Sequence, residues 1–223
     1  MIDLLSNFKI SVNEKIFIKD PESSKLGKRI IEQSILLIDD IGFDSFTFKK
    51  LGQSIGSNES SIYRYFESKH KLLLYLTAWY WAWLEYQLVF STLNITDTKK
   101  KLEKAIEIVT RTVKEDSNFS HINEVVLNRI IINEYSKSYL TKEVDAENKD
   151  GYFVVYKRLI ARLRDMILAN SPKYKYASSL ASTIVEGALH QHFLKDHFRS
   201  ITDCNSKITP TKFLTDLTFN AIK

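Results

Sequence analysis

The stretch that decides the fold is TFKKLGQSIGSNESSIYRYF, residues Thr47 to Phe66. Its first half places Phe48, Leu51 and Ile55 on one helical stripe, opposite polar residues. Thr47 can cap this helix, because its hydroxyl accepts a free backbone N–H of the first turn. The pattern predicts a short amphipathic helix at the start of the stretch.

The second half of the stretch predicts a turn and another short helix. Gly56 can take the left-handed backbone conformation that ends a helix and redirects the chain. Asn58 is a second candidate N-cap, and Glu59 suits the positive end of the helix that follows. That helix is expected to bury Ile62 and Phe66 and to leave its polar side chains outside. Two helices joined by a tight glycine turn make a helix-turn-helix.

The longer segment IGSNESSIYRYFESKHKLLLYL resembles the signature of the tetracycline-repressor (TetR) family of transcription regulators. Upstream, Ile41-Gly42-Phe43 followed by Thr47 and Leu51 matches the same family. The resemblance covers roughly residues 23 to 76, and the remaining chain is similar to the family only in helical pattern and length. The signature is carried here by Gly56, Ile62, Tyr63, Tyr65, Phe66, Lys69, Leu72 and Leu73.

The composition is that of an ordinary globular protein, with 44% apolar and 26% charged residues in a chain of 223. Only 6 glycines and 3 prolines are present, which favours long helices. The net charge of +5 permits nucleic-acid binding without requiring it. Cys204 is the only cysteine and no signal-peptide pattern is found, so we expect a cytoplasmic protein without intrachain disulfides and without membrane spans.

Apolar and polar residues alternate between residues 8 and 19, with turn-forming residues at Asn13 and Glu14 in the middle. This period of two predicts a short N-terminal β-hairpin. The alternative is an ordered or flexible N-terminal arm, since an isolated hairpin needs something to pack against.

The rest of the chain predicts an all-α fold of about nine helices. We expect three parts: an arm or hairpin (1–22), a three-helix DNA-binding domain with the helix-turn-helix (23–69), and a helical bundle for ligand binding and dimerisation (70–223). Beside the helix-turn-helix, the expected helices span about residues 21–41, 69–91, 97–113, 119–138, 145–169, 172–193 and 210–222.

The motifs of common catalytic and metal sites are not found. There is no Gly-rich phosphate loop, CxxC pair or HExxH. His190 and His197 are seven residues apart and can share a helix face, but no carboxylate at ligand spacing completes a metal site. No nucleophile, base and orienting group can be combined. We therefore expect neither an enzyme nor a bound cofactor.

The resemblance implies a one-component regulator, usually a repressor, that binds double-stranded operator DNA as a homodimer. Its recognition helix is expected to enter a major groove. Glu59 departs from the small or basic residue common in the family, and either accepts a hydrogen bond from cytosine or complements the helix dipole. Ser57 replaces the usual apolar residue of the turn. The residues assigned to DNA are Thr47, Asn58, Glu59, Ser60, Ser61, Tyr63, Arg64 and Lys69.

The helix expected at 69–91 is apolar on nearly all of its faces, which predicts that it is buried or lies between two parts of the protein. This helix starts inside the family signature, so we expect it to transmit the effect of a bound small molecule to the DNA-binding domain. The aromatic and apolar bundle predicts a largely apolar small-molecule effector. The candidate lining is Trp83, Tyr86, Phe153, Tyr156 and His190, with ordinary core packing of all five as the alternative.

The competing function is a helical small-molecule-binding protein, or an enzyme, whose helix-turn-helix does not read DNA. Salt-dependent binding to the DNA upstream of the protein's own coding sequence distinguishes the two.

Overall fold

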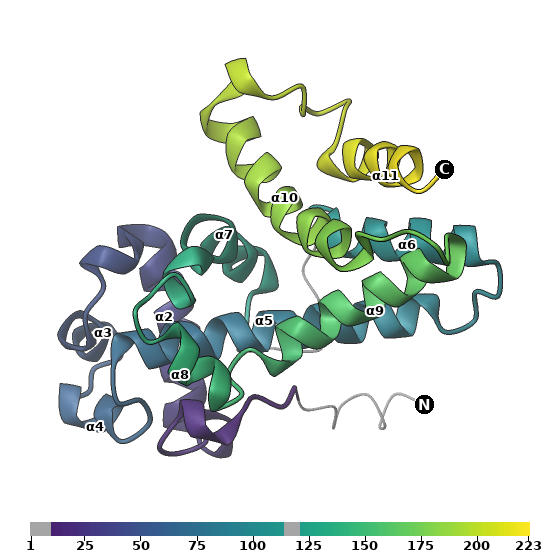
Figure 1. The fold of residues 1–223 in the computed structure, drawn as a ribbon. Coiled ribbons are helices and arrows are strands. Elements are labelled where there is room, and N and C mark those ends of the chain that lie inside the picture. The colour runs from purple at the N-terminus through teal and green to yellow at the C-terminus, as the bar shows by residue number, and fades with distance from the viewer. Residues whose placement is uncertain (1–9, 114–120) are drawn as a thin grey trace. The chain divides into compact units, whose positions relative to one another are not determined.

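The computed structural model describes residues 10–113 and 121–223. These residues form ten α-helices and four short 3-10 helices, and no strand is found among them. The all-α prediction is confirmed. The α-helices, shown in Figure 1, are α2 (Lys25–Ser45), α3 (Phe48–Ser54), α4 (Glu59–Tyr63), α5 (Lys69–Thr92), α6 (Thr98–Thr110), α7 (Glu124–Glu134), α8 (Val144–Lys149), α9 (Val154–Asn170), α10 (Ala177–His197) and α11 (Pro210–Ala221).

The chain divides into two compact units. The first unit comprises the described residues up to Ala82 together with Val113–Phe153, and the second comprises Trp83–Thr112 with Val154–Lys223. The long helix α5 contributes its first turns to the first unit and its last turns to the second.

The first unit is built from α2, α3, α4, the start of α5, α7 and α8. Its helices begin where the sequence offers capping side chains: Ser24 caps α2, Thr47 caps α3 and Asn123 caps α7. Helix α2 packs beside α7, and α3 packs beside α4. The core includes Ile30, Ile31, Ile35, Phe46, Leu51, Ile62, Phe66, Leu72, Tyr75 and Trp79, all nearly inaccessible to solvent.

The predicted β-hairpin is wrong for its described residues, 10–19. Asn13 accepts a hydrogen bond from the Lys15 backbone N–H (2.9 Å) and starts the 3-10 helix Glu14–Ile16. The Ile18 backbone N–H donates to the Tyr65 carbonyl (2.8 Å) and not to a neighbouring strand. Ile10, Val12 and Ile16 are buried whereas Ile18 is exposed, so the segment packs as a single arm that contains a short 3-10 helix. Phe8 and Lys9 lie outside the described residues.

The predicted helix over 145–169 is broken in the structure. Gly151 has a φ of 86° and separates α8 from α9. Two other predicted boundaries also differ. The helix expected at 172 begins at Ala177, and the helix expected at 119–138 begins at Glu124 and ends in the 3-10 helix Tyr135–Ser138.

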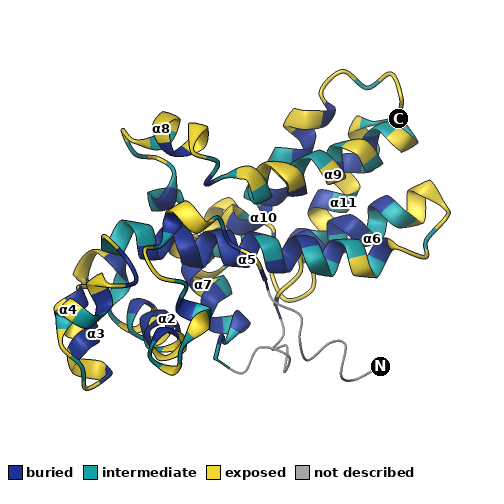
Figure 2. Ribbon diagram, turned by 90° about the horizontal axis from the view of Figure 1, so that it is seen from below, coloured by how far each residue is buried: buried dark blue, intermediate teal, exposed yellow. Residues whose placement is uncertain are grey.

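The second unit is a helical bundle in which α9 packs beside α6 and α10, and α11 beside α6 and α10. Figure 2 shows the buried faces of these helices in dark blue. The core is apolar and includes Leu102, Ile106, Leu159, Leu163, Ile167, Ile184, Val185 and Leu214. None of the helices that the structure describes is both long enough and apolar enough to cross a membrane.

One charged group is buried in this second unit. The Glu85 carboxylate, on the last turns of α5, accepts hydrogen bonds from Arg158 Nε (2.6 Å) and from Arg162 Nε (2.6 Å). Burial opposes ionisation of Glu85, but the hydrogen bonds from the two guanidinium groups outweigh it, so the pKa of the carboxyl lies below its ordinary value.

Candidate nucleic-acid interface

The helix-turn-helix is formed by α3, the turn around Gly56 and α4. Gly56 has a φ of 59°, the left-handed conformation expected from the sequence. The Ser57 backbone N–H donates to the Gly52 carbonyl (2.9 Å), which closes the turn. A Cβ on Gly52 would lie only 2.8 Å from the Ser57 oxygen, so the close approach of the two helices requires glycine. The sequence analysis did not identify Gly52 as a residue that the helix-turn-helix requires. A glycine inside a short helical pattern is nevertheless a signal that another backbone segment lies close to it.

The first turn of α4 is organised by Asn58. Its Oδ1 accepts the Ser61 backbone N–H (2.9 Å), which confirms the predicted N-cap. The same oxygen also accepts the Ser60 hydroxyl (2.9 Å) and the Ser61 hydroxyl (2.6 Å). Three residues assigned to DNA therefore first of all stabilise the helix that carries them, with their remaining polar atoms at the surface.

Tyr63, the last residue of α4, and its C-cap Arg64 both lie at the surface. Tyr63 is 47% exposed, and its ring meets Phe48 of α3 edge-on, with ring centroids 5.0 Å apart. Arg64 is exposed, whereas Glu59 is half-buried in the first turn, where a carboxylate complements the helix dipole. Lys49 of α3 is exposed on the same motif and was missing from the predicted set.

Two of the residues named for DNA, Thr47 and Lys69, hold the backbone around the start of α3. The Thr47 hydroxyl accepts the Lys50 backbone N–H (3.2 Å) and is exposed. Lys69 Nζ donates to the carbonyls of Phe43 (3.0 Å), Asp44 (3.1 Å) and Phe46 (3.2 Å). An ammonium group has three donors, so these carbonyls use all of them. Lys69 thus serves the turn between α2 and α3, a role that its place in the sequence did not reveal.

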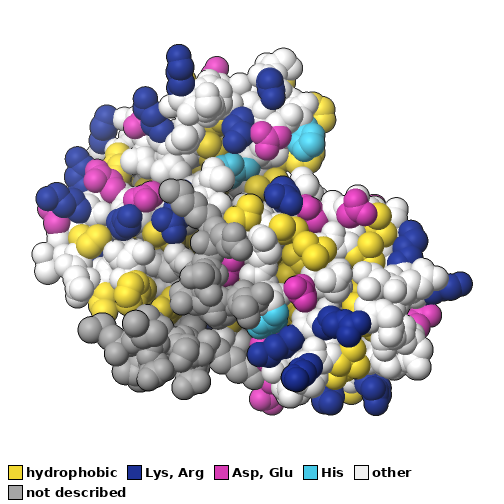
Figure 3. Space-filling model, turned by 180° about the vertical axis from the view of Figure 1, so that it is seen from behind, with side chains coloured by type: hydrophobic (Ala, Val, Ile, Leu, Met, Phe, Trp, Pro, Cys, Tyr) yellow, Lys and Arg dark blue, Asp and Glu magenta, His cyan; other side chains and the backbone are white. Residues whose placement is uncertain are grey.

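Basic side chains are dispersed on one face of the molecule. On the face shown in Figure 3, basic side chains lie in small groups separated by acidic and uncharged ones. The assignment to DNA therefore depends on the helix-turn-helix itself and not on the net charge.

The five candidate effector residues are distributed over both units. Trp83 is buried and Tyr86 stacks on Phe90, with ring centroids 6.0 Å apart, at the end of α5 in the second unit. The Tyr156 hydroxyl, also in the second unit, donates to the Glu186 carboxylate. His190 is exposed on α10, and Phe153 belongs to the first unit.

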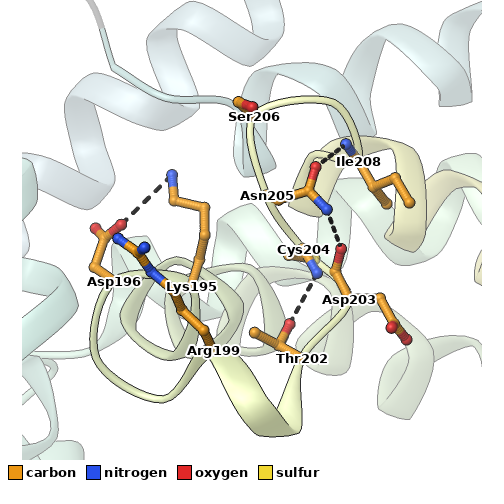
Figure 4. Close-up of a pocket in the computed structure, with 9 residues that line it drawn as sticks. All are labelled: Lys195, Asp196, Arg199, Thr202, Asp203, Cys204, Asn205, Ser206 and Ile208. Atoms are coloured by element: carbon orange, nitrogen blue, oxygen red, sulfur yellow. Dashed lines mark hydrogen bonds and ion pairs between the residues drawn. The ribbon is translucent and has the colours of Figure 1, made fainter.

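A pocket of about 550 Å³ lies in the second unit, and none of the five candidates lines it. It is formed by the end of α10, the 3-10 helix Arg199–Ile201 and the loop that follows (Figure 4). Its walls are largely polar, with Lys195 Nζ 3.8 Å from an Asp196 oxygen and the Thr202 hydroxyl accepting the Cys204 backbone N–H (3.1 Å). The pocket is therefore unlike the apolar site predicted from composition. No three His, Cys, Asp or Glu side chains gather in the described ranges as a metal site would require.

Comparison with known proteins finds a family model that matches the region of the helix-turn-helix. The family model of bacterial regulatory proteins, tetR family, matches residues 30–76. No curated protein sequence matches the chain. Similar solved structures include the superantigen PfiT, with 17% identity over 92% of this chain and 99% of that one and a TM-score of 0.59.

Two further solved structures have a similar fold. AibR in complex with isovaleryl coenzyme A and operator DNA is 16% identical over 87% of this chain and 98% of that one, with a TM-score of 0.56. The TetR-family regulator PfmR from Thermus thermophilus is 14% identical over 87% and 94%, with a TM-score of 0.57. At these identities the likeness shows the fold. The family match spans most of α2, the complete helix-turn-helix and the start of α5, so this part of the chain is similar to the tetR family of bacterial regulatory proteins.

Proposed function

We propose that this protein is a cytoplasmic one-component transcription regulator, acting as a repressor that binds operator DNA as a homodimer. A small, largely apolar effector releases it from the DNA. The observation that carries the proposal is the outward face of the helix-turn-helix. The five-residue helix α4 presents Ser60 and Tyr63 to solvent, and its C-cap Arg64 is also exposed, while Ile62 of the helix is completely buried.

The contacts on DNA follow from residue type and exposure. Arg64 and Lys49 supply positive charge for phosphates, and the Tyr63 hydroxyl supplies a further phosphate donor. The hydroxyls of Ser60 and Ser61 lie at the start of α4, where side chains of a recognition helix meet base edges. Lys69 contributes to DNA binding indirectly, because it holds the turn between α2 and α3.

The homodimer is supported by apolar side chains that the second unit leaves exposed. On α11, Phe213 is 41% exposed and Leu217 38% exposed, and Phe198 at the end of α10 is also exposed. Exposed apolar groups on neighbouring elements are typical of an interface, and a two-fold pair presents two recognition helices to two half-sites. Sedimentation should show a dimer for the parent and a monomer for the Phe213→Glu/Leu217→Glu variant.

The effector is proposed to bind in the second unit, near Trp83, Tyr86 and Tyr156. The AibR description, which names both a ligand and operator DNA, supports this type of regulation. Titrating DNA-bound protein with apolar metabolites while following Trp fluorescence should show binding coupled to a roughly 5–150-fold loss of DNA affinity. A ligand that binds tightly without changing DNA affinity would contradict the switching proposal.

The decisive experiment measures binding to duplex DNA from the region upstream of the protein's own coding sequence, at several salt concentrations. Arg64→Ala should weaken binding and flatten the salt dependence by about one phosphate contact. Arg164→Ala, which removes an exposed cation from α9, is the matched control and should bind as the parent does. If a Lys49/Tyr63/Arg64 triple Ala variant binds as tightly as the parent, the interface is wrongly assigned. Saturable ligand binding or turnover without any DNA binding would favour the competing function.

A further inference from the structure

The turn between α2 and α3, residues 42–46, sets the direction in which the chain enters the helix-turn-helix. Gly42 has φ 74° and ψ 156°, so the regular part of α2 ends at Ile41. The Phe46 backbone N–H donates to the Gly42 carbonyl (3.2 Å), and the Phe46 ring is completely buried. Thr47, the cap of α3, follows directly. A change in the backbone of this turn therefore moves α3 and, through the Gly52 contact, α4.

One side of this turn is held by Lys69, as described above. Its ammonium group binds three carbonyls of the turn and also lies 4.8 Å from the centre of the Phe43 ring. Lys69 is the first residue of α5, so this anchor comes from the helix that follows the recognition helix in the chain.

The other side is held from α7, which lies 91 residues further along the chain. Glu134, the last residue of α7, accepts the Phe43 backbone N–H on Oε1 (3.1 Å). Lys137 Nζ lies 2.8 Å from Glu134 Oε2 and 2.7 Å from an Asp44 carboxylate oxygen. Lys137 thus joins the two carboxylates, one on each side of the contact.

We propose that Glu134 and Lys137 are positioning residues for DNA binding, because they hold the turn 42–46 through groups that Lys69 does not bind, the Phe43 N–H and the Asp44 carboxylate. The inference depends on the proposed function, and it assigns to residues outside the helix-turn-helix a part in DNA affinity. Without Glu134, the nearly buried Phe43 amide loses its acceptor, and an unpaired buried donor favours rearrangement of the backbone. The turn then keeps only its anchor on α5.

The first test uses the protein alone and measures amide hydrogen exchange. Glu134→Ala should accelerate exchange of the Phe43 amide about tenfold or more, since its acceptor is gone. Glu134→Gln, which keeps an oxygen acceptor, should largely restore protection. The matched control is Arg129→Ala, because Arg129 also joins α7 to α2, through Asp39 (Nε–Oδ1 3.0 Å), but does not touch the turn. Unchanged exchange at Phe43 in Glu134→Ala would overturn the proposal.

The second test measures affinity for the same upstream duplex, at a temperature where each variant is completely folded. Glu134→Ala and Lys137→Met should bind about 2- to 30-fold more weakly, whereas Glu134→Gln and Arg129→Ala should stay within about twofold of the parent. Equal losses for Arg129→Ala and Glu134→Ala would show general loosening and overturn the positioning role. Binding of Glu134→Ala at parental strength would do the same. A parent that binds no DNA overturns the proposed function, a result that the exchange experiment does not depend on.

Discussion

The two units use polar side chains in different ways. In the first unit, Lys69, Asn58 and Glu134 bind backbone groups and thereby fix where short helices begin and turn. In the second unit, Asp97 and Thr209 also cap helices, but the buried charge of Glu85 is paired with two arginine side chains, and the helices are held mainly by apolar packing. The difference indicates that the first unit is built to place a few backbone segments accurately, whereas the second is built to pack an apolar core.

The largest expected effect breaks the charge cluster of the second unit. The Arg158→Ala/Arg162→Ala variant leaves the Glu85 carboxylate buried without its partners and should lower the free energy of unfolding by about 3 kcal/mol at pH 7. Glu85→Ala should cost less, because the two half-exposed arginines can then be hydrated. Urea unfolding measures both variants, and a larger loss for Glu85→Ala would contradict this view of the cluster.

Acid should reduce this difference. The folded-state pKa of Glu85 is lowered, so its contribution is present above the ordinary pKa of 4.5 and is lost as the pH falls through the folded-state value. Without the arginines, burial alone raises that pKa, and the carboxyl becomes neutral before the protein reaches strong acid. The stability gap between the parent and the double variant should therefore narrow when unfolding is repeated below pH 4.5.

A smaller loss is expected from the turn of the first unit. Gly42→Ala places a Cβ in a conformation, φ 74° and ψ 156°, that only glycine adopts easily, and should cost about 2 kcal/mol. Gly56→Asn is the control, because asparagine tolerates the left-handed conformation at φ 59° and should cost clearly less. Thermal unfolding measures the loss of stability in both variants. Equal losses would contradict the view that the backbone at Gly42 requires glycine more strictly than the backbone at Gly56 does.

Two caps of similar chemistry separate stability from function. Asn58→Ala on α4 and Thr209→Ala on α11 each remove one acceptor from a helix N-terminus and should each cost about 1 kcal/mol. Only Asn58→Ala should also weaken DNA binding, because α4 carries the interface. Calorimetry measures the stability of both variants and the DNA assay measures their affinity. An equal loss of DNA affinity in Thr209→Ala would contradict the claim that only the cap of α4 affects DNA binding.

The smallest effect is a gain in stability. Gly187 lies inside α10, and a Cβ there would meet Leu214 Cδ2 at 3.7 Å, an ordinary contact. Gly187→Ala should therefore raise stability by about 0.5–1 kcal/mol. Gly52→Ala should do the opposite, since its Cβ would clash with the backbone of Ser57. Urea midpoints that shift in the same direction would contradict this contrast.

Local signals predicted the helix-turn-helix well. The caps Thr47 and Asn58, the left-handed Gly56 and the buried Ile62 all depend on neighbours within a few residues, and the structure confirms each of them. The broken helix could also have been found from a local signal, because Asp150-Gly151 is a typical turn pair that the longer periodic stripe outweighed.

Distant partners account for what the sequence did not predict. The place of Lys69 in the signature predicts a phosphate contact, yet its three acceptors come from a turn more than twenty residues earlier. Glu134 finds its partner 91 residues away, and nothing around it marks the contact. The alternation in the N-terminal arm predicts a hairpin because burial of one face looks the same whether the partner is a strand or a helix.

The division of the chain has a consequence for how the protein folds during synthesis. The first unit is not contiguous in sequence, since residues 83–112 of the second unit separate its two parts. Helix α2 leaves the ribosome long before α7 and α8 exist. At a synthesis rate of about 5–20 residues per second, several seconds pass between the synthesis of α2 and that of Glu134 and Lys137, which contact the turn after α2. A fragment ending at Ala82 would permanently lack them, so we expect such a fragment to be aggregation-prone, although it contains every residue of the family signature.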